Sequence, residues 1–257
     1  PFLSWKRTDL PGVLERLRVV AVLSIFATLA IWYVTQGGPV LGYLAIMLAF
    51  WLFAATLREW AMRVRLFESS FAEVHRRARN LPRSAYGMTV AHTGLAIAIF
   101  GFVGSSVWKS EEIIFVRPGT QVAIAGFEVT FEGAERVRGP NYFADRGTLT
   151  VRKNGEFVTV LYPERRTYPV AQSTTTESAI RSTLAGDLYT SISDPASEEA
   201  GASGALTLRI LFEPLVNFIW IGSAMLVLGG GLSLSDRRLR IGAPRGKAPA
   251  PSKVPAE

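Results

Sequence analysis

"GMTVAHTGLAIAIFGFVGSSVW", residues 87–108, decides the fold class of this chain of 257 residues. Its apolar and small side chains continue for more than the roughly 17 residues that a helix needs to cross a hydrocarbon core about 30 Å thick. His92 is its only ionisable side chain. At a rise of 1.5 Å per residue, it lies about 9 Å along the helix axis from Tyr86. Ionisable side chains are expensive inside a membrane, so His92 is a candidate functional residue.

Three other stretches have the length and apolar character of membrane-spanning helices: residues 17–34, 40–57 and 215–234. The turn sequence "TQGGP" at 35–39 predicts a helical hairpin between the first two. A hydrophobic fraction of 49% is also high for a soluble protein. We therefore predict a membrane α-helical protein with four transmembrane helices.

The distribution of charge orients these helices. Residues 1–18, 58–85 and 235–257 carry four, seven and six Lys or Arg residues, whereas residues 109–213 hold 11 basic and 14 acidic residues. The positive-inside rule places both termini and the Arg-rich loop in the cytoplasm and residues 109–213 outside. Because the basic residues lie at helix ends, lipid and topology explain them, and we expect no nucleic-acid partner.

Residues 110–212 alternate apolar and polar side chains between turn signals, which is typical of antiparallel strands. Asn154-Gly155 predicts a type I′ hairpin, and "ALTLRILFEP" at 205–214 predicts a last strand before the fourth helix. The pattern of residues 171–184 is polar and helical. We expect one small antiparallel β domain, extracytoplasmic, between the third and fourth spans.

We expect the chain to divide into three parts. Residues 193–204 have the Ser, Pro and Gly content of a mobile loop, and the tail from residue 242 lacks apolar periodicity, as disordered segments do. The parts are residues 1–108, with three transmembrane helices and the cytoplasmic loop 58–85; residues 109–213, the extracytoplasmic β domain; and residues 214–257, with the fourth transmembrane helix and a disordered basic cytoplasmic tail.

Three roles are open to His92 on its residue pattern alone. Neutral imidazole is a good ligand for haem iron, with its second ring nitrogen held by a hydrogen bond. Gly87, Gly94 and Gly101 recur every seven residues and make part of this helix smooth enough for a flat macrocycle or another helix. The alternatives are a packing role, in which His92 bonds across a helix interface, and a proton relay.

Other candidate groups are weaker. His75 lies in the Arg-rich loop, and "PERR" at 163–166 is typical of a solvated face. The chain has no cysteine, which excludes disulfides and thiol chemistry of its own. No nucleophile elbow, phosphate loop or paired metal ligands are visible, so the sequence does not indicate a hydrolase or a nucleotide-using enzyme.

Several short stretches along the chain are distinctive in their order and spacing. They are "LSWKR" at 3–7, "GMTVAHTGLA" at 87–96, "GPNY" at 139–142, "VLYPERRTY" at 160–168, "TTESAI" at 175–180, "DLY" at 187–189, "EPLVNFIWIG" at 213–222 and "GGGLSLSDRRLR" at 229–240. Together they resemble CcmF, the large membrane subunit of the bacterial cytochrome c haem lyase, in its C-terminal part. The resemblance runs along nearly the whole chain.

The resemblance implies a specific function. In that family two membrane histidines hold a b-type haem, and the one in the "AHxG" span corresponds to His92, which makes it an axial ligand of the haem iron. The family attaches haem to the Cys-x-x-Cys-His motif of apocytochrome c, taking it from the haem-loaded chaperone CcmE, with CcmH and CcmI as partners. The implied location is the bacterial inner membrane, with the β domain in the periplasm.

This sequence departs from the family pattern in ways that matter. The family's tryptophan-rich external segment, its two external histidines and its second membrane histidine are absent. We therefore expect a C-terminal portion or one piece of a split protein, with the second haem ligand supplied by the remainder of the haem lyase subunit. Alternative functions are a non-catalytic membrane anchor that docks partners while His92 only packs, and a proton-coupled transporter segment.

Overall fold

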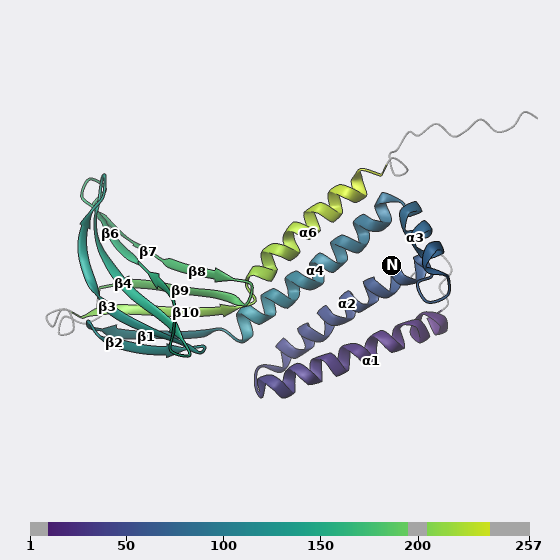
Figure 1. Cartoon of the computed structure of the whole chain (residues 1–257), viewed down its shortest axis with the longest axis horizontal. Helices are drawn as coiled ribbons and strands as arrows, with labels where there is room; N and C mark the ends of the chain where they lie inside the picture. Colours follow the sequence, from purple (N-terminus) through teal and green to yellow (C-terminus); the bar gives the residue numbers. More distant parts are fainter. Residues whose placement is uncertain (1–9, 195–204, 237–257) are drawn as a thin grey trace, which may run out of the picture.

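The computed structural model describes residues 10–194 and 205–236, which form a set of helices followed by a β domain and a last helix (Figure 1). Most of the expected loop at 193–204 and the whole tail from residue 242 lie outside the described residues. The helices are α1 (Leu10–Thr35), α2 (Val40–Val64), α3 (Phe71–Asn80), α4 (Arg83–Val107) and α6 (Asn217–Leu234). The strands are β1 (Ser110–Val116), β2 (Thr120–Ile124), β3 (Phe127–Arg138), β4 (Phe143–Lys153), β5 (Glu156–Leu161), β6 (Glu164–Tyr168), β7 (Ser173–Glu177), β8 (Ala179–Thr183), β9 (Gly186–Ser193) and β10 (Leu206–Pro214).

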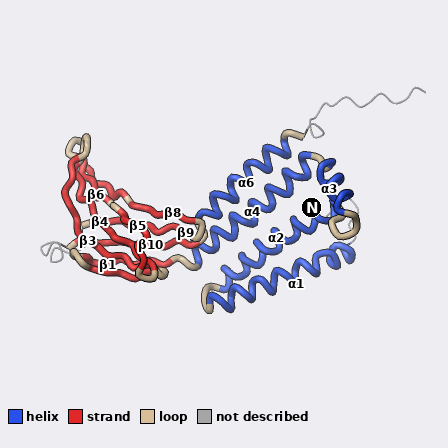
Figure 2. Tube along the Cα trace, viewed as in Figure 1, coloured by secondary structure: helices blue, strands red, loops and turns tan. Residues whose placement is uncertain are grey.

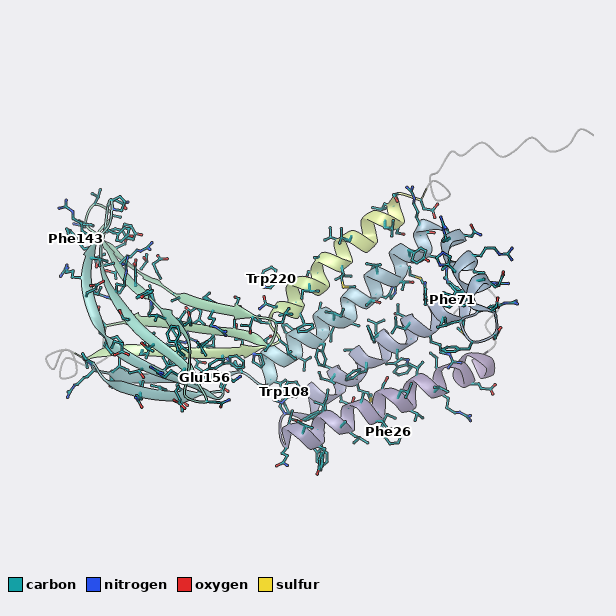
Figure 3. All side chains as sticks on the ribbon, viewed as in Figure 1. Phe26, Phe71, Trp108, Phe143, Glu156 and Trp220 are labelled. Carbon is teal, nitrogen blue, oxygen red and sulfur yellow. The ribbon has the colours of Figure 1, made fainter. Side chains whose placement is uncertain are left out.

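Within the described ranges, four helices are long and apolar enough to cross a membrane, as the hydropathy predicts: Leu17–Thr35, Val40–Val64, Arg83–Val107 and Asn217–Leu234. They lie side by side in the order α1, α2, α4, α6, with α3 at the end away from the β domain (Figures 1 and 2). Figure 3 labels Phe26 on α1 and Trp220 on α6, whose side chains are 66% and 71% exposed. Such exposure of large apolar side chains suits contact with lipid.

The glycine repeat of α4 is packed against α6. A Cβ added at Gly94 would lie 2.7 Å from the carbonyl oxygen of Gly222, and one added at Gly222 would lie 2.4 Å from that of Gly94. Gly87 and Gly101 meet the backbone of α6 in the same way. This smooth face is therefore filled by a helix, as small residues in membrane helices allow, and is not open to a macrocycle.

The β domain is built from two antiparallel sheets, with strand orders β1-β10-β9-β8 and β2-β3-β4-β6-β7. Strand β5 belongs to the second sheet and pairs with β4. Their facing sides bury one apolar core, which includes Val129, Leu149 and Ile210, each 0% exposed. Asn154 and Gly155 have φ of 53° and 79° and join β4 to β5. The hairpin predicted from these two residues and the last strand predicted at 205–214 are confirmed.

Residues 171–184 are not helical. Ser173–Glu177 pairs with β6, and Ala179–Thr183 pairs with β9. Both strands lie at the edge of a sheet and bury little, so they lack the alternation that marks a strand in the sequence. The helical prediction was wrong because it rested on the polar composition of this stretch and did not weigh its threonines, whose branched side chains favour strands.

A short junction ties the β domain to α6. Leu215, with a φ of 60°, donates its backbone N–H to the carbonyl oxygen of Ala185 at 3.0 Å. Asn217 Nδ2 donates to the carbonyl oxygen of Thr183 at 2.9 Å and to Asp187 Oδ1 at 2.7 Å. These bonds connect the first turn of α6 to the β8–β9 hairpin, so the helix and the sheet are fixed together.

Candidate functional site

His92 lies in the third turn of α4, with its side chain partly buried. Its Nδ1 is 2.9 Å from the carbonyl oxygen of Met88, one turn earlier in the helix. A carbonyl oxygen only accepts hydrogen bonds, so Nδ1 carries the proton and donates it. The lone pair of the neutral ring is then on Nε2, which has no hydrogen-bond partner among the described residues.

The side of α4 that carries His92 faces away from α6. His92 precedes Gly94 by two residues, which places it roughly 160° around a helix of 3.6 residues per turn. Gly94 faces α6, while Phe100 packs edge-on against Phe50 of α2 with ring centroids 5.9 Å apart. His92 therefore lies on a side of α4 that does not face α6.

This geometry fits one axial ligand of a haem iron. Ligating histidines generally donate their second ring N–H to a carbonyl or a carboxylate, which fixes the tautomer and aims the other nitrogen at the metal. His75, the other histidine of the chain, is exposed on α3, a helix where we expected a loop. The two histidines are on separate helices, and the described residues contain no group of three or more potential metal ligands.

A buried carboxylate lies at the same level of the helix layer as His92. Gly42 of α2 contacts Val107 of α4, so the two helices run antiparallel and the last turns of α2 are level with His92. Glu59 lies in these last turns of α2 and is 6% exposed. Its Oε1 accepts a hydrogen bond from Arg63, while its Oε2 has no hydrogen-bond partner in the described part of the chain. Glu59 was not among the residues predicted from the sequence, although its spacing of four residues from Arg63 indicates such a pair.

The β domain carries a second buried carboxylate, in the "PERR" stretch. Glu164 is 6% exposed and accepts hydrogen bonds from Arg146 Nε at 2.7 Å and from Arg166 Nε at 2.8 Å. The guanidinium of Arg166 also lies 4.5 Å from the centre of the Tyr142 ring. The interpretation of residues 163–166 as a solvated face was therefore wrong for Glu164. Arg166, which Glu164 holds, brings "VLYPERRTY" against Tyr142 of "GPNY".

Electrostatics explain why Glu164 is stable in this position. Burial raises the pKa of a carboxyl, but the hydrogen bonds from Arg166 and Arg146 outweigh burial and hold the pKa of Glu164 below its ordinary value. Glu164 in turn raises the pKa of Arg166 through the same hydrogen bond. A charged triad of this kind fixes strands β4 and β6 to each other and to the turn at 139–142.

Comparison with known proteins places these features in a family. Residues 107–214 match the family described as CcmF C-terminal beta-sandwich. The cytochrome c-type biogenesis protein CycK of Bradyrhizobium diazoefficiens is 38% identical over 257 residues, all of this chain and 38% of the relative. CcmF of Escherichia coli is 31% identical over 242 residues, 93% of this chain and 35% of the relative.

A solved structure has the same fold. The protein named Cytochrome c Heme Lyase CcmF matches with a TM-score of 0.62 and 18% identity, over 91% of this chain and 36% of that one. This chain thus spans less than two-fifths of the length of these relatives. Its sequence and fold agree in assigning it: the chain belongs to the CcmF family of cytochrome c-type biogenesis proteins and corresponds to their C-terminal portion.

Proposed function

We propose that this chain holds a b-type haem in the membrane, with His92 as one axial ligand, as part of the haem lyase subunit of cytochrome c maturation. The observation that carries the proposal is the hydrogen bond from Nδ1 of His92 to the carbonyl oxygen of Met88, which leaves Nε2 as a ligand. When bound, the haem would supply one-electron redox chemistry. The task of this chain's residues is then to hold the imidazole ring and keep water away from it.

The second axial ligand is assigned to the remainder of the subunit. A haem with two histidine ligands needs one from each side of the ring, and this chain has His92 alone within a predicted span. The chain therefore completes the site only in the full assembly. By itself it is expected to give at most weak or high-spin haem and to be catalytically incomplete.

The wider role follows from the family. The full assembly transfers haem from CcmE to the CxxCH motif of apocytochrome c, with CcmH and CcmI as partners. The chain lies in the inner membrane with both termini cytoplasmic and the β domain periplasmic, which the distribution of Lys and Arg supports. The β domain, with no histidine, cysteine or methionine in residues 110–212, is assigned a docking or scaffold role.

Reduced-minus-oxidised spectra of the full assembly test this function, with cytochrome c maturation measured in the same strains. His92→Ala is expected to remove the low-spin haem signal and stop maturation while the protein remains inserted. His75→Ala is the matched control, because it deletes the other histidine from an exposed position on α3. An unaltered low-spin haem in His92→Ala would show that His92 only packs and would favour the anchor function.

A further inference from the structure

The distal tip of the β domain carries a cluster of arginines and aromatic rings that the haem proposal does not use. We define the tip as residues 136–144 and 165–176, which include parts of β3, β4, β6 and β7. Figure 3 labels Phe143 here, at the end of the domain away from the helices. The tip contains four arginines and no aspartate or glutamate, whereas acidic residues outnumber basic ones in residues 109–213 as a whole. Positive charge is therefore concentrated at one end of an acidic domain.

Phe143 lies on the inner face of its sheet, beyond the end of the apolar core. Alternate residues of a strand share a face, so Phe143 points to the same side as Gly147. A Cβ added at Gly147 would lie 3.3 Å from Ile192 of β9, one residue before that strand ends. Phe143 is four residues nearer the start of β4 and is 37% exposed. Among the described residues, the inner face therefore continues past the core and is open at the tip.

Two arginines of β3 flank the ring of Phe143. The guanidinium carbons of Arg136 and Arg138 lie 5.7 Å and 5.8 Å from the ring centre. Both arginines are exposed, and the contact with Phe143 is the interaction that each side chain makes in the described part of the chain. Two cations are therefore held on one partly exposed aromatic ring.

The neighbouring carboxylates are paired elsewhere or point away. Asp145 is opposite Arg136 in the strand ladder, but its carboxylate lies 3.2 Å from the guanidinium of Arg165. Glu135 precedes Arg136 in the chain, so it points to the opposite face of the sheet. Within the described ranges, Arg136 and Arg138 therefore have no carboxylate at ion-pair distance.

We infer that the tip binds an acidic segment of a partner protein in extended conformation. This inference rests on the docking role proposed for the β domain. Arg136 and Arg138 are two residues apart on one strand, roughly 7 Å along it, and carboxylates at alternate positions of an extended peptide have the same spacing. Arginine binds a carboxylate through two parallel hydrogen bonds, and Phe143 offers apolar surface between the two pairs.

The composition and position of the tip favour a protein partner. Arginine and aromatic side chains are enriched among the residues that dominate binding energy at protein interfaces. A lipid headgroup would also suit arginine, but the tip is at the end of the molecule away from the membrane-spanning helices (Figure 1). The acidic segment therefore belongs to a protein outside the membrane.

Fluorescence anisotropy on the purified full assembly tests this inference, with a labelled peptide in which glutamate alternates with valine. The reference probe is the same peptide with lysine in place of glutamate. The wild type should bind the acidic peptide more tightly. The double variant Arg136→Gln, Arg138→Gln should weaken binding of the acidic peptide about tenfold, because one exposed ion pair contributes about threefold to an equilibrium constant.

The double variant Arg152→Gln, Lys153→Gln is the matched control. It removes two exposed positive charges from the other end of β4, roughly 30 Å from Phe143. Its affinity for the acidic peptide should change less than twofold. Equal effects of the two double variants would show a response to net charge alone and would overturn the inference.

Two other results would also overturn it: equal affinity of the wild type for the two peptides, or unchanged binding in a folded variant with both tip arginines replaced. The haem spectrum of the same samples reports on His92 separately, because no tip residue lies in a membrane-spanning helix. Failure of peptide binding would therefore leave the haem proposal untouched.

Discussion

Gly222→Ala should destabilise the helix pair α4–α6 far more than the same substitution elsewhere on α6. The new Cβ would lie 2.4 Å from the carbonyl oxygen of Gly94 and 2.5 Å from the backbone nitrogen of Ala98. Both obstacles are backbone atoms, which cannot rotate away, so the two helices must separate. Overpacking of this kind costs about 3 kcal/mol at the upper end of its usual range. The higher helix propensity of alanine returns about 1 kcal/mol.

The net expectation is therefore a loss of about 2 kcal/mol in the free energy of unfolding. Gly230→Ala is the control, because a Cβ at Gly230 has nothing within 4 Å. That variant should be unchanged or more stable by up to about 1 kcal/mol. The assay is unfolding of the purified protein by titration with a denaturing detergent, followed by circular dichroism. Equal midpoints for Gly222→Ala and Gly230→Ala would refute the close contact between the two helices.

Three further predictions concern the β domain and the topology. Glu164→Gln should cost about 2 kcal/mol, less than a fully buried pair because both arginines are partly exposed, measured by chemical unfolding. Because the pKa of Glu164 is lowered in the folded protein, its contribution to the free energy of unfolding is present above the ordinary value of 4.5 and is lost as the pH falls through the lowered pKa. In Glu164→Gln, the free energy of unfolding should therefore lose the part of its pH dependence that the wild type shows in this acid range. An acid profile equal to that of the wild type would contradict this. Residues 110–212 alone should give a β-rich circular dichroism spectrum and no haem uptake, and stoichiometric haem binding would count against the assignment to His92. Reporter fusions should place residues 37 and 150 outside and residue 70 inside, and a cytoplasmic β domain would refute the orientation.

The sequence was sufficient for features that depend on local pattern. Continuous apolar stretches predict the four spans, because a helix in lipid must present apolar side chains on all sides. Asn154-Gly155 predicts its hairpin, because both residues tolerate the positive φ that the turn requires. His92 was visible because it is the one ionisable side chain in its span.

Features that depend on tertiary contacts were missed or predicted wrongly. Glu164 was predicted to be a surface residue. Its burial depends on Arg146 of β4, 18 residues earlier in the chain, together with Arg166 of β6. Asn217 holds α6 to the β8–β9 hairpin through partners about 30 residues earlier in the chain, and no local pattern indicates that contact. The direction in which the glycine repeat faces also depends on α6, which follows α4 only after the whole β domain.

Rescue by imidazole tests the central claim, that Nε2 of His92 ligates a haem iron, most directly. In the full assembly carrying His92→Gly, the deleted side chain leaves a space that free imidazole fits. The low-spin haem spectrum should be lost in this variant and should return when imidazole is added, with no effect of imidazole on the wild type. A low-spin spectrum that persists in His92→Gly without imidazole would contradict the claim and make His92 a packing residue.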